Sequence, residues 1–262
     1  MISQQSQVDP GAKLGKNVKI HPFVVIDDNV EIGDNCEIMP FTHIVNGTRM
    51  GSNNRIFEGC IIGADPQDFR WTGEDTHCYI GDNNVIRENV IINRGIRRQG
   101  GTRIDNGVFI MAQSHIGHDS WIKDEVVLGN GISIAGDTEV GKNSILSSRV
   151  VLHENTRVGD WVLVKGGCRI GSNVPPYSIF AHNPVEFLGV NAVVMRRKGF
   201  SDDDIQSAAK SYRHLYQTQT SVFNAVKRIN EDVDEGEIRF NILEFIDRCG
   251  NRLVSIPAEL NG

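Results

Sequence analysis

An aliphatic residue returns at every sixth position along most of the first 170 residues. A period of six fits neither an α-helix, which turns every 3.6 residues, nor a continuous strand, which alternates every two. It predicts a short strand and a turn in each repeat, coiled into a parallel β-helix whose neighbouring coils satisfy each other's backbone hydrogen bonds. The inward-facing residues are expected to be Val8, Leu14, Ile20, Ile26, Ile32, Ile38, Ile44, Met50, Ile56 and Ile62, then Ile80, Ile86 and Ile92, then Ile104, Ile110, Ile116, Ile122, Leu128, Ile134, Val140, Leu146, Leu152, Val158, Val164 and Ile170.

This repeat resembles that of the hexapeptide-repeat transferases. The resemblance implies a left-handed β-helix shaped as a triangular prism, with three repeats, about 18 residues, in each turn. The left-handed winding comes from the resemblance alone, because parallel crossovers are otherwise right-handed. In such a prism, residues 18 positions apart stack one above the other at about 4.8 Å, the spacing of neighbouring strands.

Two interruptions of the repeat are expected to be loops that leave the prism, at about 63–79 and 93–103. The flanking runs stay in phase, but polar residues such as Asp68 and Arg98 occupy aliphatic positions within the gaps. The first segment mixes charged and aromatic residues, whereas the second is basic and rich in glycine. Loops on a rigid scaffold commonly carry binding residues, although solvated loops without a function are the alternative.

The six-residue period stops after Ile170, and from Ser201 onward the apolar residues have helical spacing. Ser201 is expected to cap a helix that has three aspartates in its first turn. Two further apolar sets begin at Val222 and Ile238 and indicate a small helical domain. The predicted organisation is mainly β, with a left-handed parallel β-helix over residues 1–185 and a C-terminal α-helical domain over residues 186–262.

Charge and composition narrow the classes of partner and compartment. With 27 basic and 33 acidic residues, the net charge of -6 gives no overall attraction to nucleic acid or anionic lipid. Five scattered cysteines without a C-x-x-C pair suit a reducing compartment. The chain has neither a signal-peptide pattern nor a long apolar run, so we expect a soluble cytoplasmic protein without stable membrane insertion.

A polar cluster at residues 113–119 carries the clearest chemistry, because His115 and His118 flank the inward-facing Ile116. The two histidines could be surface residues, two ligands of a metal site, or a general base with a helper. No third ligand with convincing spacing accompanies them, which weakens the metal interpretation. Gly136 lies 18 positions after His118, so the next coil would present an approachable backbone N–H above the imidazole. A base beside such a donor suits acyl transfer to a hydroxyl group.

A closer resemblance rests on the order and spacing of several short motifs. These motifs are Gln67-Asp68 with Gly73-Glu74, Ile86-Arg87-Glu88, Asn93-Arg94-Gly95, His115-Ile116-Gly117-His118-Asp119, Ala135-Gly136, Val174-Pro175-Pro176-Tyr177, Gly189-Val190-Asn191 and Arg196-Arg197-Lys198-Gly199-Phe200-Ser201. Together they resemble the UDP-N-acetylglucosamine 3-O-acyltransferases of lipid A biosynthesis. That family implies a cytoplasmic homotrimer, with active sites between adjacent prisms, that moves an (R)-3-hydroxyacyl chain from acyl carrier protein to the 3-hydroxyl of UDP-N-acetylglucosamine. The resemblance implies no cofactor and no metal.

The resemblance also assigns roles to individual positions. It implies that His118 is the general base, that Asp119 orients it, and that the Gly136 N–H stabilises the oxyanion. The implied substrate-binding residues, with the one that limits acyl-chain length given last, are Gln67, Asp68, Arg70, His115, His153, Glu154, Asn191, Arg197 and Gly166.

Three positions depart from the family pattern. Asp137 stands where a second histidine is frequent, Glu154 follows His153 where glutamine is common, and Arg70 replaces a lysine. Asp137 lies 18 positions after Asp119, so the two carboxylates should stack and repel unless one is solvated or protonated.

Other interpretations remain open at the level of the residues. They are a related acyltransferase with a 3-amino sugar acceptor, a prism-shaped zinc carbonic anhydrase, and a non-catalytic nucleotide-sugar-binding subunit. The N-acyltransferase that acts later in the pathway has an N-terminal domain, for which a repeat beginning near Val8 leaves no room. An acidic carrier protein would need local basic clusters, for which the candidates are Arg94, Arg97, Arg98, Arg103, Arg196, Arg197 and Lys198.

Overall fold

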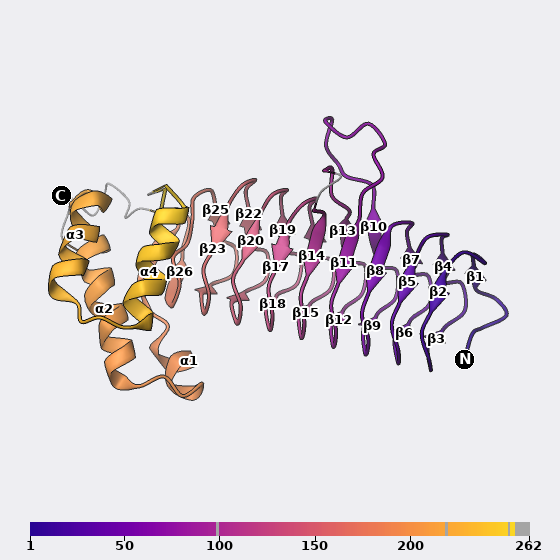
Figure 1. The fold of residues 1–262 in the computed structure, drawn as a ribbon, viewed down its shortest axis with the longest axis horizontal. Helices are drawn as coiled ribbons and strands as arrows, with labels where there is room; N and C mark the ends of the chain where they lie inside the picture. Colours follow the sequence, from indigo (N-terminus) through magenta and orange to yellow (C-terminus); the bar gives the residue numbers. More distant parts are fainter. Residues whose placement is uncertain (98–99, 218–219, 251, 255–262) are drawn as a thin grey trace.

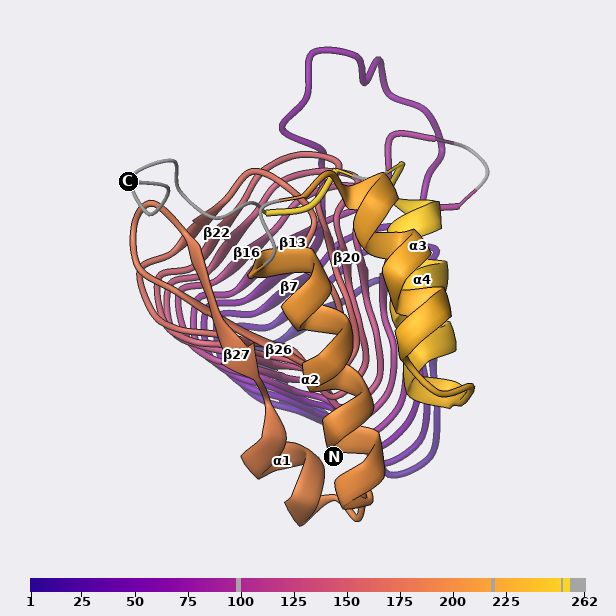
Figure 2. The same ribbon diagram turned by 90° about the vertical axis from the view of Figure 1, so that its left-hand side faces the viewer.

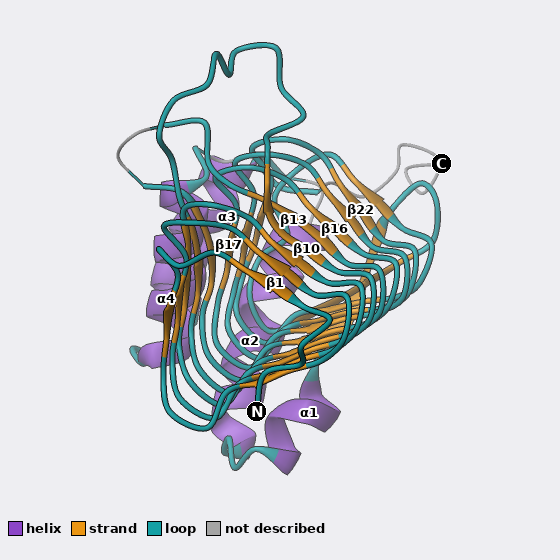
Figure 3. Ribbon diagram, turned by 90° about the vertical axis from the view of Figure 1, so that its right-hand side faces the viewer, coloured by secondary structure: helices purple, strands orange, loops and turns teal. Residues whose placement is uncertain are grey.

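The computed structural model describes residues 1–97, 100–217, 220–250 and 252–254. A long solenoid of short strands occupies most of the molecule, and a group of helices covers its C-terminal end (Figure 1). Viewed from its other end, the solenoid is a three-sided prism (Figure 3). The expected combination of a β-helix and C-terminal helices is confirmed.

Each side of the prism is one sheet. The first sheet contains β1 (Gln7–Val8), β4 (Val25–Ile26), β7 (His43–Ile44), β10 (Ile61–Ala64), β13 (Ile91–Asn93), β16 (His115–Ile116), β19 (Ser133–Ile134), β22 (Val151–Leu152) and β25 (Arg169–Ile170). The second sheet contains β2 (Lys13–Leu14), β5 (Glu31–Ile32), β8 (Thr48–Met50), β11 (Cys78–Ile80), β14 (Thr102–Ile104), β17 (Trp121–Ile122), β20 (Glu139–Val140) and β23 (Arg157–Val158). The third sheet contains β3 (Lys19–Ile20), β6 (Glu37–Ile38), β9 (Arg55–Ile56), β12 (Val85–Ile86), β15 (Phe109–Ile110), β18 (Val127–Leu128), β21 (Ile145–Leu146), β24 (Leu163–Val164), β26 (Ser178–Ala181) and β27 (Glu186–Val190).

The register follows the repeat. Stacked partners such as Lys13 and Glu31 are 18 residues apart. The separation is 30 residues across the first interruption and 24 across the second, so one coil gains two repeats and another gains one. Every predicted inward aliphatic is buried except Val8 and Leu14, which are partly buried near the N-terminal end. The core is therefore a ladder of aliphatic side chains along the prism axis.

Most corners of the prism contain a residue with left-handed backbone conformation, again at a spacing of six. Asparagine is frequent there, as at Asn17, Asn29 and Asn35, because its short polar side chain tolerates positive φ. Asp119 (φ 54°) and Asp137 (φ 56°) occupy this corner position in two successive coils. Their placement follows from the repeat that builds the prism.

The C-terminal helices are α1 (Ala192–Arg197), α2 (Asp202–Tyr216), α3 (Val222–Asp232) and α4 (Glu237–Arg248). Ser201 caps α2 as predicted, in a reciprocal capping box with Asp204. Helix α2 packs on β27, which extends the third sheet antiparallel to β26 (Figure 2). The domain boundary after residue 185 stays a prediction.

Candidate active site

One edge of the prism, where the first sheet turns into the second, carries the polar residues singled out by the sequence. The first loop (residues 65–77) joins β10 to β11. The second loop joins β13 to β14, and the structure describes its residues 94–97 and 100–101. The turn containing His118 joins β16 to β17 in the next coil. Three successive coils therefore bring two loops and the histidine turn to one edge, from which the loops project (Figure 3).

A carboxylate faces each ring nitrogen of His118. Its Nδ1 lies 2.9 Å from Oδ2 of Asp119, the next residue in the turn. Its Nε2 lies 3.2 Å from Oδ2 of Asp68, which belongs to the first loop. The exposed fractions of these side chains are only 8% for His118, 4% for Asp119 and 16% for Asp68. This arrangement fixes the imidazole and aims Nε2 toward the first loop.

Gly136 lies directly against the imidazole, as the 18-residue spacing predicts. A Cβ atom at this position would be 2.3 Å from Nε2 of His118, so no other residue fits without displacing the ring. Among the described residues, none accepts a backbone hydrogen bond from Gly136. An N–H is thus available one coil away from a potential base.

Two of the departures from the family pattern contact each other. The Arg70 guanidinium donates to both oxygens of Asp68, at 2.9 and 2.7 Å, and also to Oε1 of Glu154 at 2.8 Å. The hydrogen bonds from Arg70 lower the pKa of Asp68. The arginine therefore holds the first loop against the coil that carries Glu154.

Asn93 is a site residue that sequence reasoning did not assign. Its Oδ1 lies 2.7 Å from Nε2 of His115, and its Nδ2 donates to the backbone oxygen of Asp65 at 2.6 Å. Burial, and secondarily the charge of His118, lower the pKa of His115. Asn93 can accept from a neutral His115 with its proton on Nε2. The sequence did contain a signal for Asn93. If the second interruption adds one repeat to its coil, Asn93 lies 24 residues before Gly117 and therefore one coil below the turn that contains His118.

These groups surround a cavity of about 340 Å³. Its lining residues are Gln67, Asp68, Asn93, His115, Gly117, His118, Ser133, Ile134, Ala135, Gly136, Val151, Leu152 and Glu154. Six of the residues predicted from the sequence therefore line one cavity. Asp119 and Arg70 do not line it but contact residues that do: Asp119 contacts His118, and Arg70 contacts Asp68 and Glu154.

Besides Asp119 and Arg70, four predicted site residues do not line this cavity. His153 is exposed beside Glu154. Asn191 is buried and donates to the Trp161 backbone oxygen at 2.9 Å, whereas Arg197 is exposed in α1. Helix α1 lies on the opposite edge of the molecule from the two loops (Figures 1 and 2). Gly166 is in the turn between β24 and β25, where a Cβ would be 3.0 Å from the Ser148 oxygen.

The stacked carboxylates at positions 119 and 137 have separate partners. Asp119 Oδ2 accepts a hydrogen bond of 2.9 Å from the Ile96 N–H, and Asp137 forms an ion pair with Arg97. The predicted repulsion is therefore offset by the second loop.

The arginines predicted to attract an acidic carrier protein at the second loop have partners within the protein. Arg94 is buried and donates to the Gly63 backbone oxygen at 3.1 Å, so the expectation that it is available to a carrier protein is wrong. Arg97 is engaged by Asp137, Arg103 stacks over the Tyr79 ring, and Arg98 lies outside the described residues.

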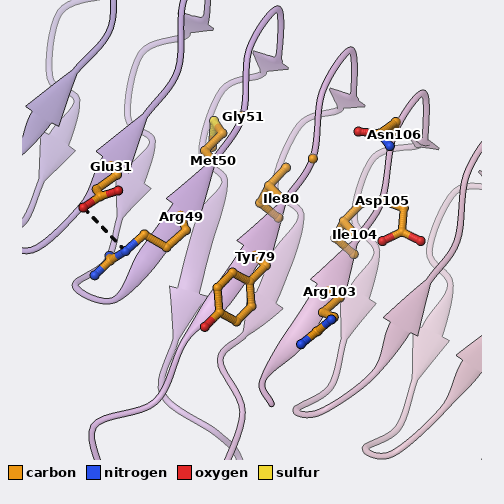
Figure 4. Close-up of a pocket in the computed structure, with 11 residues that line it drawn as sticks. Glu31, Arg49, Met50, Gly51, Tyr79, Ile80, Arg103, Ile104, Asp105 and Asn106 are labelled. Atoms are coloured by element: carbon orange, nitrogen blue, oxygen red, sulfur yellow. Dashed lines mark ion pairs between the residues drawn. The ribbon is translucent and has the colours of Figure 1, made fainter. Parts of the chain in front are cut away.

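A larger cavity, of about 590 Å³, lies on the second sheet (Figure 4). Its wall includes Glu31 and Arg49, whose closest charged atoms are 3.9 Å apart, together with Tyr79 and Arg103. Among its described lining residues there is no histidine or cysteine. Its carboxylates have protein partners: Glu31 lies beside Arg49, and Asp105 accepts a hydrogen bond from the Trp121 indole N–H at 2.8 Å.

No group of three or more His, Cys, Asp or Glu side chains within the described ranges is arranged to hold a metal ion. None of the helices that the structure describes combines the length and apolar character needed to cross a membrane.

The prism and its histidine turn define a class of protein, the hexapeptide-repeat acyltransferases with a left-handed parallel β-helix. A family model described as UDP-N-acetylglucosamine O-acyltransferase, domain 2, matches residues 173–254, and one described as the GMPPB C-terminal domain matches residues 2–99. The first match spans β26, β27 and the C-terminal helices, and the second spans the N-terminal half of the solenoid.

Individual relatives narrow the class. The acyl-(acyl-carrier-protein)–UDP-N-acetylglucosamine O-acyltransferase of Sulfurovum sp. is 41% identical over 91% of this chain and 92% of its own length. The enzyme of the same name from Pseudomonas putida (strain W619) is 38% identical over 88% of this chain and 90% of its own length. The crystal structure of the UDP-N-acetylglucosamine acyltransferase from Bacteroides fragilis has a TM-score of 0.94 at 40% identity, covering 98% of this chain and all of that one. The crystal structure of the UDP-N-acetylglucosamine acyltransferase from Francisella novicida has a TM-score of 0.95 at 31% identity, covering 100% of this chain and 96% of that one. The chain belongs to the acyl-(acyl-carrier-protein)–UDP-N-acetylglucosamine O-acyltransferase family.

Proposed function

We propose that this protein transfers an (R)-3-hydroxyacyl chain from acyl carrier protein to the 3-hydroxyl of UDP-N-acetylglucosamine, the first step of lipid A biosynthesis. Family membership supports the acyl donor, the nucleotide sugar and the reaction class. The single observation that carries the mechanism is the position of His118, with Asp119 on one nitrogen and Gly136 against the other side of the ring.

In the proposed step, Nε2 of His118 accepts the proton of the sugar hydroxyl as its oxygen attacks the thioester carbonyl. A C–O bond forms, and the carbonyl oxygen of the tetrahedral intermediate accepts a hydrogen bond from the Gly136 N–H. Collapse of the intermediate breaks the C–S bond, and the imidazolium returns its proton to the sulfur. The products are the acylated nucleotide sugar and the carrier-protein thiol.

Asp68 and Asp119 have different tasks in this mechanism. Asp119 accepts from Nδ1–H throughout, which keeps Nε2 available as the proton acceptor. Asp68 occupies the space beside Nε2, so the sugar hydroxyl must take its place there. We infer that the displaced carboxylate and the neighbouring Gln67 then bind the sugar, while Arg70, His115, His153 and Glu154 complete the sugar-side contacts.

The remaining predicted residues fit a homotrimer. Because α1 lies on the opposite edge from the loops, Asn191 and Arg197 of one protomer would serve the cavity of its neighbour. There they would hold the uridine diphosphate, and Gly166 would leave the end of the acyl groove open. These assignments, together with a cytoplasmic location, follow from the family resemblance.

The test is turnover of radiolabelled UDP-N-acetylglucosamine with a defined 3-hydroxyacyl carrier protein. We expect wild-type transfer, and a rate at least about a thousandfold lower in folded His118→Ala. His43→Ala is the matched control, because His43 also has an aspartate partner at 2.9 Å but lies outside the cavity.

Each outcome bears on a different part of the proposal. Full activity in folded His118→Ala would overturn the assigned base. Transfer only to the 3-amino analogue of the sugar would move the protein to the alternative acceptor. Binding without turnover of either sugar would make it a nucleotide-sugar-binding subunit.

A further inference from the structure

The second loop approaches the proposed base through a backbone group. The Ile96 N–H donates to Oδ2 of Asp119 at 2.9 Å, and this oxygen also faces Nδ1 of His118 at 2.9 Å. Only one atom of Asp119 therefore separates the loop from the imidazole. The position of the second loop sets the direction in which the Asp119 carboxylate points.

The next residue fastens the same loop to the coil above. Arg97 forms an ion pair with Asp137, whose own N–H donates to the backbone oxygen of His118 at 2.9 Å. Asp137 is 11% exposed, whereas Arg97 is 56% exposed. The arginine thus connects the loop to the coil that supplies Gly136.

Charge gives this contact a second effect. Asp119 and Asp137 occupy the same corner position of successive coils. The His118 ring and the Ile96 N–H satisfy Asp119, and Arg97 satisfies Asp137. Without Arg97, a nearly buried negative charge would remain one coil from Asp119 and would favour the protonated form of a nearby imidazole.

We propose that Arg97 is a positioning residue for acyl transfer, and that it acts through Asp137 and the Ile96 N–H on the Asp119–His118 pair. This inference rests on the proposed function. It differs from a carrier-docking role, in which Arg97 would contribute its charge to the acidic partner. The two roles predict different behaviour of the Asp137→Asn protein.

The central experiment compares kcat and the KM for acyl carrier protein in Arg97→Gln, Asp137→Asn and the double variant. Positioning predicts about a tenfold lower kcat in Arg97→Gln, because small misplacements of catalytic groups are costly. It predicts a lower kcat in Asp137→Asn as well, and no further loss in the double variant, because both changes open one contact. Arg97→Lys should recover part of the rate.

A docking role predicts a different pattern. Arg97→Gln would raise the KM for acyl carrier protein at unchanged kcat, and Asp137→Asn would free the arginine and leave kcat unchanged or improve binding. That pattern in an active wild-type enzyme would overturn the inference, as would unchanged kinetics in both single variants. Lack of transfer by the wild type would instead refute the proposed function.

The pH profile of kcat/KM separates positioning from general loss of structure. The titratable groups around His118 are Asp119 in its turn, His115 on β16 and Asp68 on the first loop, with Arg70 on Asp68 and Asp137 behind Asp119. We expect the acid limb to move to higher pH in Arg97→Gln and not in Asp137→Asn. An unmoved limb in Arg97→Gln would contradict the charge effect.

Arg55→Gln is the matched control for these measurements. Arg55 is 53% exposed and lies 3.8 Å from Glu37 on the adjacent coil, so it is also a half-exposed arginine beside a neighbouring carboxylate. It belongs to the third sheet, away from the loops. Its replacement should leave kcat, the pH profile and the melting temperature unchanged; a decrease in kcat equal to that of Arg97→Gln would overturn the assignment.

Discussion

The two loops leave the same edge of the prism from successive coils, yet they approach His118 by different means. The first loop presents a side chain, the Asp68 carboxylate, to Nε2. The second presents a backbone N–H, from Ile96, to the carboxylate that faces Nδ1. In the proposed mechanism, the side chain lies where the sugar hydroxyl binds, whereas the backbone contact lies where nothing needs to move during the reaction.

The two loops are therefore expected to have different tasks: the first recognises the substrate, and the second orients the Asp119–His118 pair. In the proposed mechanism, Asp68 exchanges its contact with Nε2 for contacts with the sugar, so its contribution depends on the identity of the side chain. The Ile96 N–H is present in any residue except proline, so its contribution depends on the path of the backbone. Substitutions in the first loop should therefore alter substrate binding, and those that displace the second loop should alter turnover.

The largest effect expected from this comparison is on Asp119→Asn. Removing the charge behind Nδ1 should lower kcat about a hundredfold, with little change in the KM for UDP-N-acetylglucosamine. Asp68→Asn should chiefly raise that KM. Steady-state kinetics with both substrates varied would measure the two effects, and Asp27→Asn, in the pair with His43, provides the control. A raised KM at unchanged kcat in Asp119→Asn would contradict the division of tasks.

A backbone change in the second loop should have a smaller effect, about a tenfold decrease in kcat. In Gly95→Ala, the new Cβ would be 2.6 Å from Gly101 Cα and 2.8 Å from Asp119 Oδ1, so the loop must shift. Gly171→Ala is the control, because a Cβ there has no neighbour within 4 Å. Equal rates for the two folded variants would show that turnover does not depend on the path of this loop.

The end of the proposed acyl groove should respond more gently to substitution. Each buried methylene contributes about 0.8 kcal/mol, roughly fourfold in kcat/KM. We expect the wild type to prefer long 3-hydroxyacyl donors and Gly166→Met to prefer shorter ones while turnover continues. Lys165→Met adds the same side chain one position earlier and should leave the profile unchanged. Parallel donor-length profiles for wild type and Gly166→Met would place the end of the chain elsewhere.

The smallest effect concerns stability in mild acid. The pKa of His115 is lowered in the folded protein, so the unfolded chain binds its proton at higher pH. Stability should therefore fall as pH decreases through about 6.5 and level off below the folded pKa. Between pH 7.5 and 5.5, wild type should lose roughly 2 °C more in melting temperature than His115→Gln. An identical decrease in wild type and His115→Gln would refute the linkage.

Much of the scaffold could be predicted because its signal repeats. The aliphatic positions, the helix cap at Ser201 and the stacking of Gly136 on His118 all follow from local spacing. The contact between Arg70 and Glu154 spans 84 residues and depends on the path of a non-repeating loop. The Ile96 N–H could not be predicted at all, because a backbone donor has no residue signature.

The departures from the family pattern show a further limit of reading positions one by one. Arg70 and Glu154 each look like an isolated replacement in the sequence, yet they contact each other. Asp137 stands where a histidine is frequent, and Arg97 from the second loop neutralises it. The substitutions become intelligible only as pairs, and the loops bring the members of each pair together.

The backbone conformation of Asp119 indicates that this residue affects activity far more than stability. Enzymes often hold catalytic groups in strained conformations that lower the stability of the whole domain. Here the corner that holds Asp119 adopts the conformation found at most other corners of the prism, and asparagine is frequent at that position. Exchange of Asp119 for asparagine should therefore lower kcat about a hundredfold and leave the melting temperature of the protein almost unchanged. Loss of catalysis and loss of folding can be selected independently at this residue.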